Sequence, residues 1–129
     1  MRTPDRREVA TALAVDIAAV VIFVAIGRRS HDEGNALGEL ARTVLPFLLG
    51  LAAGWGVVRA WRRPTALLTG IAIWPVTVLV GMVLRRWVFD RGTATSFVVV
   101  ATLFIGAFLV GWRAVAGAAA RRRAAAPAR

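Results

Sequence analysis

The chain has 129 residues, 58% of them hydrophobic, and a formal net charge of +10 from 17 basic residues, all arginine, against seven acids. A soluble domain of this size is rarely so apolar, so the composition predicts an integral membrane protein. The arginines flank hydrophobic segments without an aromatic-basic module, which argues against nucleic acid as a partner. Cysteine is absent, and this excludes disulfides and thiolate metal sites.

Four stretches have the length of a membrane span, which needs about 20 mostly apolar residues. We predict spans over residues 9–27, 36–58, 66–84 and 93–112. A short N-terminus (residues 1–8), three loops and a basic tail (residues 113–129) remain, and none is long enough to bury a soluble core. The predicted fold is all-α, a single four-helix transmembrane bundle whose first partner is the lipid bilayer.

A cleaved signal peptide is the alternative for the first segment, because Ala25-Ile26-Gly27 is a small-x-small pattern after an apolar run. That run is long for a signal peptide, and Asp16 interrupts it. An intact first span fits better.

The arginines are unevenly divided between the two sides of the predicted bundle. The N-terminus, the second loop and the tail share one side and carry eleven arginines, whereas the other side carries six. The positive-inside rule therefore predicts a multi-pass protein of the cytoplasmic (inner) membrane with both termini in the cytoplasm. Because arginines near a membrane surface attract anionic lipid, we expect such lipid at the cytoplasmic tail.

Small residues and a weak internal repeat bear on helix packing. Gly50 and Gly54 have GxxxG spacing, which lets two helix backbones approach closely, either within the chain or in a homo-oligomer. One uniform shift places Arg28-Arg29 on Arg85-Arg86 and Gly54-Trp55 on Gly111-Trp112. Two parallel helical-hairpin repeats are therefore an alternative description of the bundle, with chance identity as the competitor.

Asp16 lies close to the centre of the first predicted span. A short acidic side chain at this depth costs roughly 2.5–3.5 kcal/mol on insertion scales, so it should face protein or a wet cavity. Counting from the centres of the other spans brings three polar side chains to the same level: Trp74, Thr77 and Thr102. Together with Asp16 they form the predicted midplane polar site.

Two interpretations of Asp16 compete. In the structural one, hydrogen bonds to threonine and tryptophan let the acid hold the helices together. In the functional one, Asp16 binds a proton, a cation or a cationic substrate during transport. Replacing Asp16 with Asn separates them, because a transporter should lose flux while it still folds.

The sequence also predicts a basic rim at the outer ends of the first and third spans. Guanidinium groups there either contact lipid headgroups or form an anion site for phosphate or carboxylate. The residues are Arg28, Arg29, His31, Arg85 and Arg86. His31 is the only histidine, and a solvated loop residue is its simplest interpretation over a metal ligand or a pH-sensitive group.

The residues resemble a known family, the uncharacterised and mainly actinobacterial membrane proteins grouped as Domain of Unknown Function 3054. The resemblance covers nearly the whole chain and implies a small four-span protein without a known activity. It rests on Asp16 followed by GRRSH, on PFLLG and GW (Pro46 to Trp55), on RRP (Arg62 to Pro64), on WPVTVLVGMVLR (Trp74 to Arg85) and on GWR (Gly111 to Arg113).

By architecture alone the chain is also similar to the small multidrug-resistance transporters, which carry an acid in the first of four spans, although they use Glu there. No catalytic or metal-binding motif occurs, so we expect no enzyme, cofactor or metal. The leading hypothesis is a small transporter or channel-like protein that uses Asp16. The alternative is a non-catalytic membrane scaffold or accessory subunit, and a homo-oligomer is expected in either case.

Overall fold

The computed structural model describes residues 3–28, 36–89 and 95–126, and four α-helices dominate it. They are α1 (Arg6–Arg28), α2 (Ala36–Val58), α3 (Leu67–Trp87) and α4 (Thr95–Ala125), with a short 3-10 helix, η1 (Ala60–Arg62), between α2 and α3. Each α-helix is long and apolar enough to cross a membrane. The all-α prediction of four membrane helices is confirmed.

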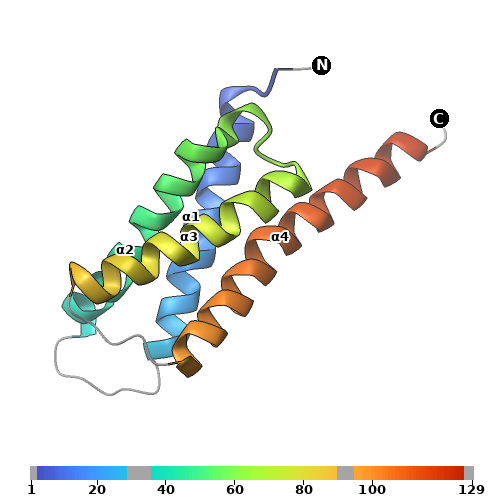
Figure 1. Cartoon of the computed structure of the whole chain (residues 1–129). Coiled ribbons are helices and arrows are strands. Elements are labelled where there is room, and N and C mark those ends of the chain that lie inside the picture. Colours follow the sequence, from blue (N-terminus) through green and yellow to red (C-terminus); the bar gives the residue numbers. More distant parts are fainter. Residues whose placement is uncertain (1–2, 29–35, 90–94, 127–129) are drawn as a thin grey trace.

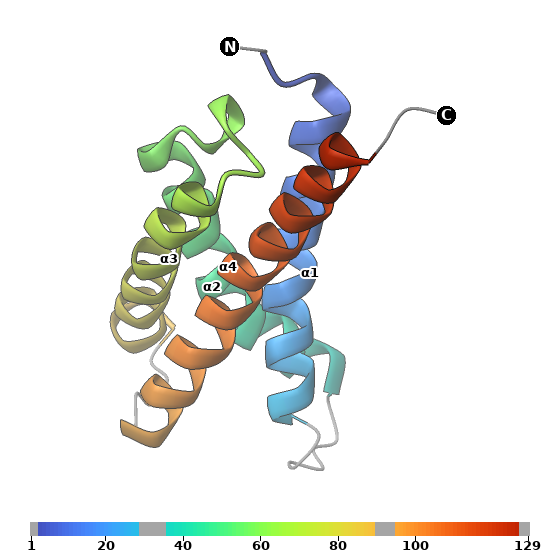
Figure 2. The ribbon, with the colours of Figure 1, turned by 90° about the vertical axis from the view of Figure 1, so that its right-hand side faces the viewer.

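The first and the last α-helix meet the same end of the bundle with their outer termini. Figure 1 shows α1 beginning and α4 ending there, beside the connection between α2 and α3. We call this the terminal end, and the other the loop end. α4 crosses obliquely and contacts both α1 and α3 (Figures 1 and 2).

Local sequence explains where the first and last helices begin and end. Oδ1 of Asp5 accepts the backbone N–H of Glu8 at 2.8 Å, which caps the first turn of α1. α4 continues far beyond the expected span because alanine, the strongest helix former, dominates its second half. It ends at Ala125 because the next residue, Ala126, precedes Pro127, and helical backbone angles are disfavoured for a residue before proline.

The glycine stripe of α2 packs within the chain, and α2 and α3 share the most extensive helix contact. A Cβ atom at Gly50 would lie 2.5 Å from the carbonyl oxygen of Thr77, and one at Gly54 would lie 3.1 Å from Ile73. The two backbones therefore approach as closely as glycine permits, as GxxxG spacing predicts.

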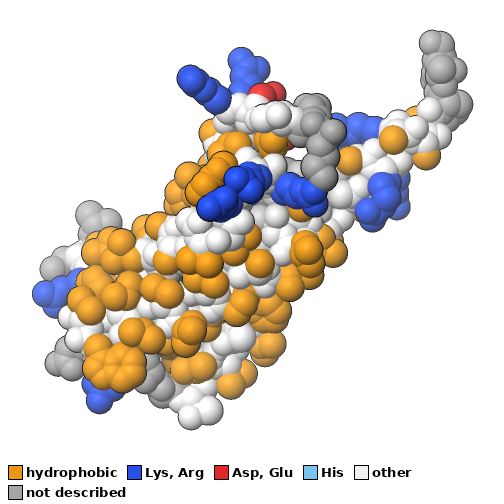
Figure 3. Space-filling model, turned by 45° about the horizontal axis from the view of Figure 1, so that its top comes forward, with side chains coloured by type: hydrophobic (Ala, Val, Ile, Leu, Met, Phe, Trp, Pro, Cys, Tyr) orange, Lys and Arg blue, Asp and Glu red, His pale blue; other side chains and the backbone are white. Residues whose placement is uncertain are grey.

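Aromatic rings fill the core towards the loop end. Phe23 of α1 lies edge-on to Phe47 of α2, with ring centroids 6.1 Å apart, and 5.3 Å from Phe104 of α4. Aliphatic side chains continue this core to the middle of the bundle, among them the fully buried Val20, Leu51, Ile73, Ile105 and Leu109. On the surface, hydrophobic side chains cover the flank of the bundle and arginines gather near its ends (Figure 3).

Candidate functional site

Asp16 is the centre of a buried polar cluster. Its side chain is on α1 and has a relative exposure of 0%, and its neighbours Ala12, Ala19 and Val20 are buried as well. Small residues on this face let other helices come close to the carboxylate. A buried carboxylate is costly unless it is paired and hydrogen-bonded, so its partners define the site.

The carboxylate accepts four hydrogen bonds from three side chains. Arg113 of α4 donates from both terminal nitrogens, Nη1 to Oδ1 at 2.9 Å and Nη2 to Oδ2 at 2.7 Å. The indole N–H of Trp55 of α2 donates to Oδ2 at 2.9 Å, and that of Trp112 of α4 donates to Oδ1 at 2.8 Å. Two donors on each oxygen fill the roughly four lone-pair sites of a carboxylate.

Arg113 is as deeply buried as the acid, with a relative exposure of 1%. Beyond Asp16 it donates from Nε to the carbonyl of Pro64 at 2.9 Å and from Nη1 to that of Leu109 at 2.8 Å. Its guanidinium carbon also lies 4.5 Å from the ring centroid of Trp112. Arg113 therefore joins α4 to α1 and to the segment before α3, and it neutralises the buried acid.

The three predicted neighbours of Asp16 donate hydrogen bonds to backbone carbonyls. The indole of Trp74 donates to the carbonyl of Thr102 at 2.8 Å, so the structure brings these two together, away from the acid. The hydroxyls of Thr77 and Thr102 donate to carbonyls four residues earlier in their own helices, those of Ile73 and Val98. Three of the four predicted site residues thus have partners other than the carboxylate.

The physical reason is the reach and tilt of the elements. The prediction placed residues at one level by counting along spans that were taken as upright, whereas α4 crosses the bundle obliquely (Figure 2). It also discarded residues at span ends, although a tryptophan or arginine side chain there extends far into the bundle. The cluster therefore includes residues from the last turn of α2, from the segment before α3 and from α4 at the end of the expected span, namely Trp112 and Arg113.

One sequence signal pointed to two of the missed residues. The shift that suggested a repeat places Gly54-Trp55 on Gly111-Trp112, and both tryptophans donate to Asp16, one to each oxygen. Both tryptophans lie near span ends, where the usual role of tryptophan is interfacial anchoring, and this interpretation did not point to Asp16. Arg113 stood out only as part of a basic flank and as the last residue of the GWR motif that carries the family resemblance.

The predicted outer rim is only partly described. Arg29 and His31 lie outside the described residues, and so does the side chain of Arg28. Arg85 packs against an aromatic ring, with its guanidinium carbon 4.1 Å from the ring centroid of Phe97. Arg86 is exposed on α3 and contributes to a groove between α3 and α4.

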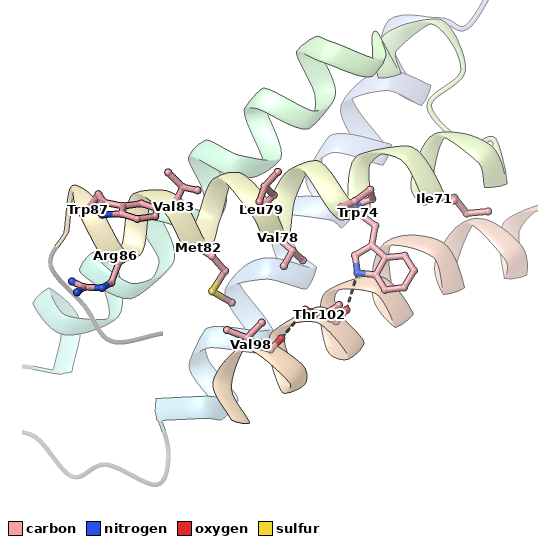
Figure 4. A pocket seen from close by; sticks show the side chains of 11 residues that line it. Ile71, Trp74, Val78, Leu79, Met82, Val83, Arg86, Trp87, Val98 and Thr102 are labelled. Atoms are coloured by element: carbon pink, nitrogen blue, oxygen red, sulfur yellow. Dashed lines mark hydrogen bonds between the residues drawn. The ribbon is translucent and has the colours of Figure 1, made fainter. Parts of the chain in front are cut away.

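That groove, the α3–α4 groove, has a volume of about 690 Å³. α3 and α4 touch near Gly70, where a Cβ atom would lie 2.8 Å from the carbonyl oxygen of Leu109, and they separate towards the loop end (Figure 1). Figure 4 shows the lining side chains, with Trp74 bonded to Thr102 between the helices. The lining residues are Ile71, Trp74, Pro75, Val78, Leu79, Met82, Val83, Arg86, Trp87, Val98 and Thr102.

A second cavity, the terminal cleft, lies at the opposite end and has a volume of about 560 Å³. Its wall combines polar residues such as Glu8, Thr65 and Arg123 with small residues of α4. Trp112 also belongs to this wall, so one side chain contacts both the cleft and the buried carboxylate. Among the described residues, His, Cys, Asp and Glu form no group of three or more that would hold a metal ion.

The arrangement can now be compared with known proteins. No curated protein matches the chain, and no solved structure does. A family described as protein of unknown function (DUF3054) matches residues 13–116, a range that contains all four members of the buried cluster. The chain therefore belongs to the DUF3054 family.

Proposed function

We propose that the protein is a non-catalytic membrane scaffold or accessory subunit, and that Asp16 serves its assembly rather than transport. The observation that carries this proposal is the saturation of the carboxylate, which already accepts four hydrogen bonds. A transported cation would need the same oxygen lone pairs. Arg113 also cancels the negative charge that would attract it.

The energetics of a buried ion pair support a structural role. Removing one partner from such a pair leaves an uncompensated buried charge and costs about 3–5 kcal/mol, whereas replacing both with apolar groups is often neutral. Here the pair connects α1 to α4, which share the smallest of the main helix contacts. Asp16 and Arg113 thus add directional bonding where apolar packing is sparse.

A double-mutant cycle tests the structural half of the proposal. Asp16→Asn and Arg113→Met are each expected to lower the free energy of unfolding in detergent by about 3–5 kcal/mol, and the double variant by much less than their sum. Arg122→Met is the matched control, because Arg122 is exposed on the same helix. Additive losses would show that the two side chains act independently and would contradict the assignment.

A flux assay tests the functional half. Vesicles that contain the purified protein and a pH-sensitive dye are expected to show no proton or organic-cation flux above protein-free vesicles. If the wild-type protein carries flux and a folded Asp16→Asn variant does not, the protein is a transporter and the scaffold proposal is refuted. Flux that survives this substitution would also contradict the scaffold, but it would leave Asp16 structural.

One observation favours the transporter as the second candidate. Trp112 lies between the terminal cleft and Asp16, so rotation of a single indole would open a route from the cleft to the carboxylate. In that case Trp112→Ala should raise the rate of flux, whereas in a scaffold it only destabilises the bundle. The same vesicles distinguish the two outcomes.

A further inference from the structure

We propose that the α3–α4 groove binds one acyl chain of an anionic phospholipid whose phosphate is held by Arg86. This proposal is independent of the scaffold assignment. It rests on the shape of the groove, on the chemistry along its length and on the position of the one charged residue that lines it.

The length of the groove suits a hydrocarbon chain. From Ile71 to Arg86 it extends about 22 Å along α3 at the helical rise of ~1.5 Å per residue. The hydrocarbon core of a bilayer is about 30 Å thick, so an acyl chain from one leaflet needs about 15 Å and fits within this length. A single extended chain can therefore lie in the groove along α3.

The chemistry of the groove is polarised along its length. Pro75, Val78 and Met82 present apolar surface in its middle, and the polar groups of Trp74 and Thr102 are directed at each other, N–H to carbonyl. The walls therefore offer an acyl chain dispersion contacts without an unsatisfied polar atom at that bond.

Arg86 closes the polar end of the groove. It is exposed in the last turn of α3, beside Trp87, which is 75% exposed (Figure 4). A guanidinium group has five N–H donors in a planar fork and binds phosphate oxygens bidentately. An indole next to it is typical of the headgroup level of a membrane. A phosphate at Arg86 would direct the attached chain along the groove towards Ile71.

The probe is phosphatidylglycerol, titrated against phosphatidylcholine and followed by native mass spectrometry of the protein in a non-ionic detergent. One arginine near a membrane surface contributes about 1 kcal/mol, so the wild-type protein should bind the anionic lipid about fivefold more tightly. Arg86→Gln should abolish that preference. Arg42→Gln, at an exposed arginine of α2 towards the same end, should retain it.

A second pair of variants tests the acyl chain. Val98→Trp narrows the groove and should reduce binding of both lipids, whereas Val115→Trp, the same change at an exposed position of α4, should not. Leu79→Trp, on the opposite wall, replaces Val98→Trp if circular dichroism shows that the latter does not fold. Glycerol phosphate alone should not compete, because it lacks the chain.

Three results would overturn the proposal. Equal losses in Arg86→Gln and Arg42→Gln would mean a diffuse attraction to basic surface. Unchanged lipid binding in the folded groove-filling variant would place the lipid elsewhere. A dimer that Val98→Trp converts to a monomer would make a second copy of the chain the occupant.

Discussion

The close approach of the α2 and α3 backbones makes a testable prediction about Gly50. Replacing Gly50 with Ala places a methyl group 2.5 Å from the carbonyl oxygen of Thr77 and 3.0 Å from the backbone nitrogen of Gly81. Both obstacles are main-chain atoms of α3, so no side-chain rotation relieves the overlap. The matched control is Gly56→Ala, on the same helix, where a Cβ atom meets nothing within 4 Å.

The magnitude follows from the distance that must be regained. Ordinary van der Waals contact begins at 3.4 Å, so α2 and α3 must separate locally by nearly 1 Å. Overpacking of this kind typically costs about 1–3 kcal/mol. Glycine to alanine in a helix otherwise gains about 0.5–1 kcal/mol, and Gly56→Ala obtains this gain without the overlap. We therefore expect Gly50→Ala to be less stable than Gly56→Ala by about 1–3 kcal/mol.

The assay is unfolding in mixed detergent micelles, followed by circular dichroism with increasing sodium dodecyl sulfate. Gly50→Ala should unfold at a lower denaturant fraction than the wild-type protein, and Gly56→Ala at an equal or higher one. Equal midpoints for the two variants would mean that α2 and α3 do not meet through these backbones, and the packing argument would fail.

Two further predictions concern tryptophan. Gly106→Ala would overlap the indole of Trp74 and should lower the free energy of unfolding by about 1–3 kcal/mol relative to Gly111→Ala, which has open space; equal stability would contradict the contact. Trp55→Phe and Trp112→Phe each remove one hydrogen bond to a buried carboxylate and should each cost about 1.5–3 kcal/mol in the same titration, whereas a loss confined to one variant would leave the other indole without a role.

The fold was largely predictable because hydrophobic length is a property of the sequence alone. Four apolar stretches of membrane length predict four helices, and GxxxG spacing predicts a close backbone approach at Gly50. The end of α4 was less predictable, since hydropathy falls after Trp112 while helix propensity continues through the alanine-rich tail to Ala125.

The hydrogen-bond donors of Asp16 could not be predicted from the sequence, for a different reason. Burial of Asp16 follows from its depth, but the identity of its donors depends on the tilt of α4 and on how far long side chains extend. Arg113 is one of 17 basic residues, and composition does not distinguish a buried arginine from a solvated one. Only three-dimensional packing separates Arg113 from the arginines of the tail.

Two kinds of helix association thus operate in one small bundle. α2 and α3 associate through glycines and close backbone contact, which needs no polar group. α1 and α4 meet through the ion pair of Asp16 and Arg113, which is directional and fixes the rotation of both helices about their axes. Because the same guanidinium also binds the carbonyl of Pro64, the start of α3 is positioned by the charge that neutralises α1. The acid in the first apolar segment is therefore best explained as the acceptor that specifies where α4 and the α2–α3 connection must lie.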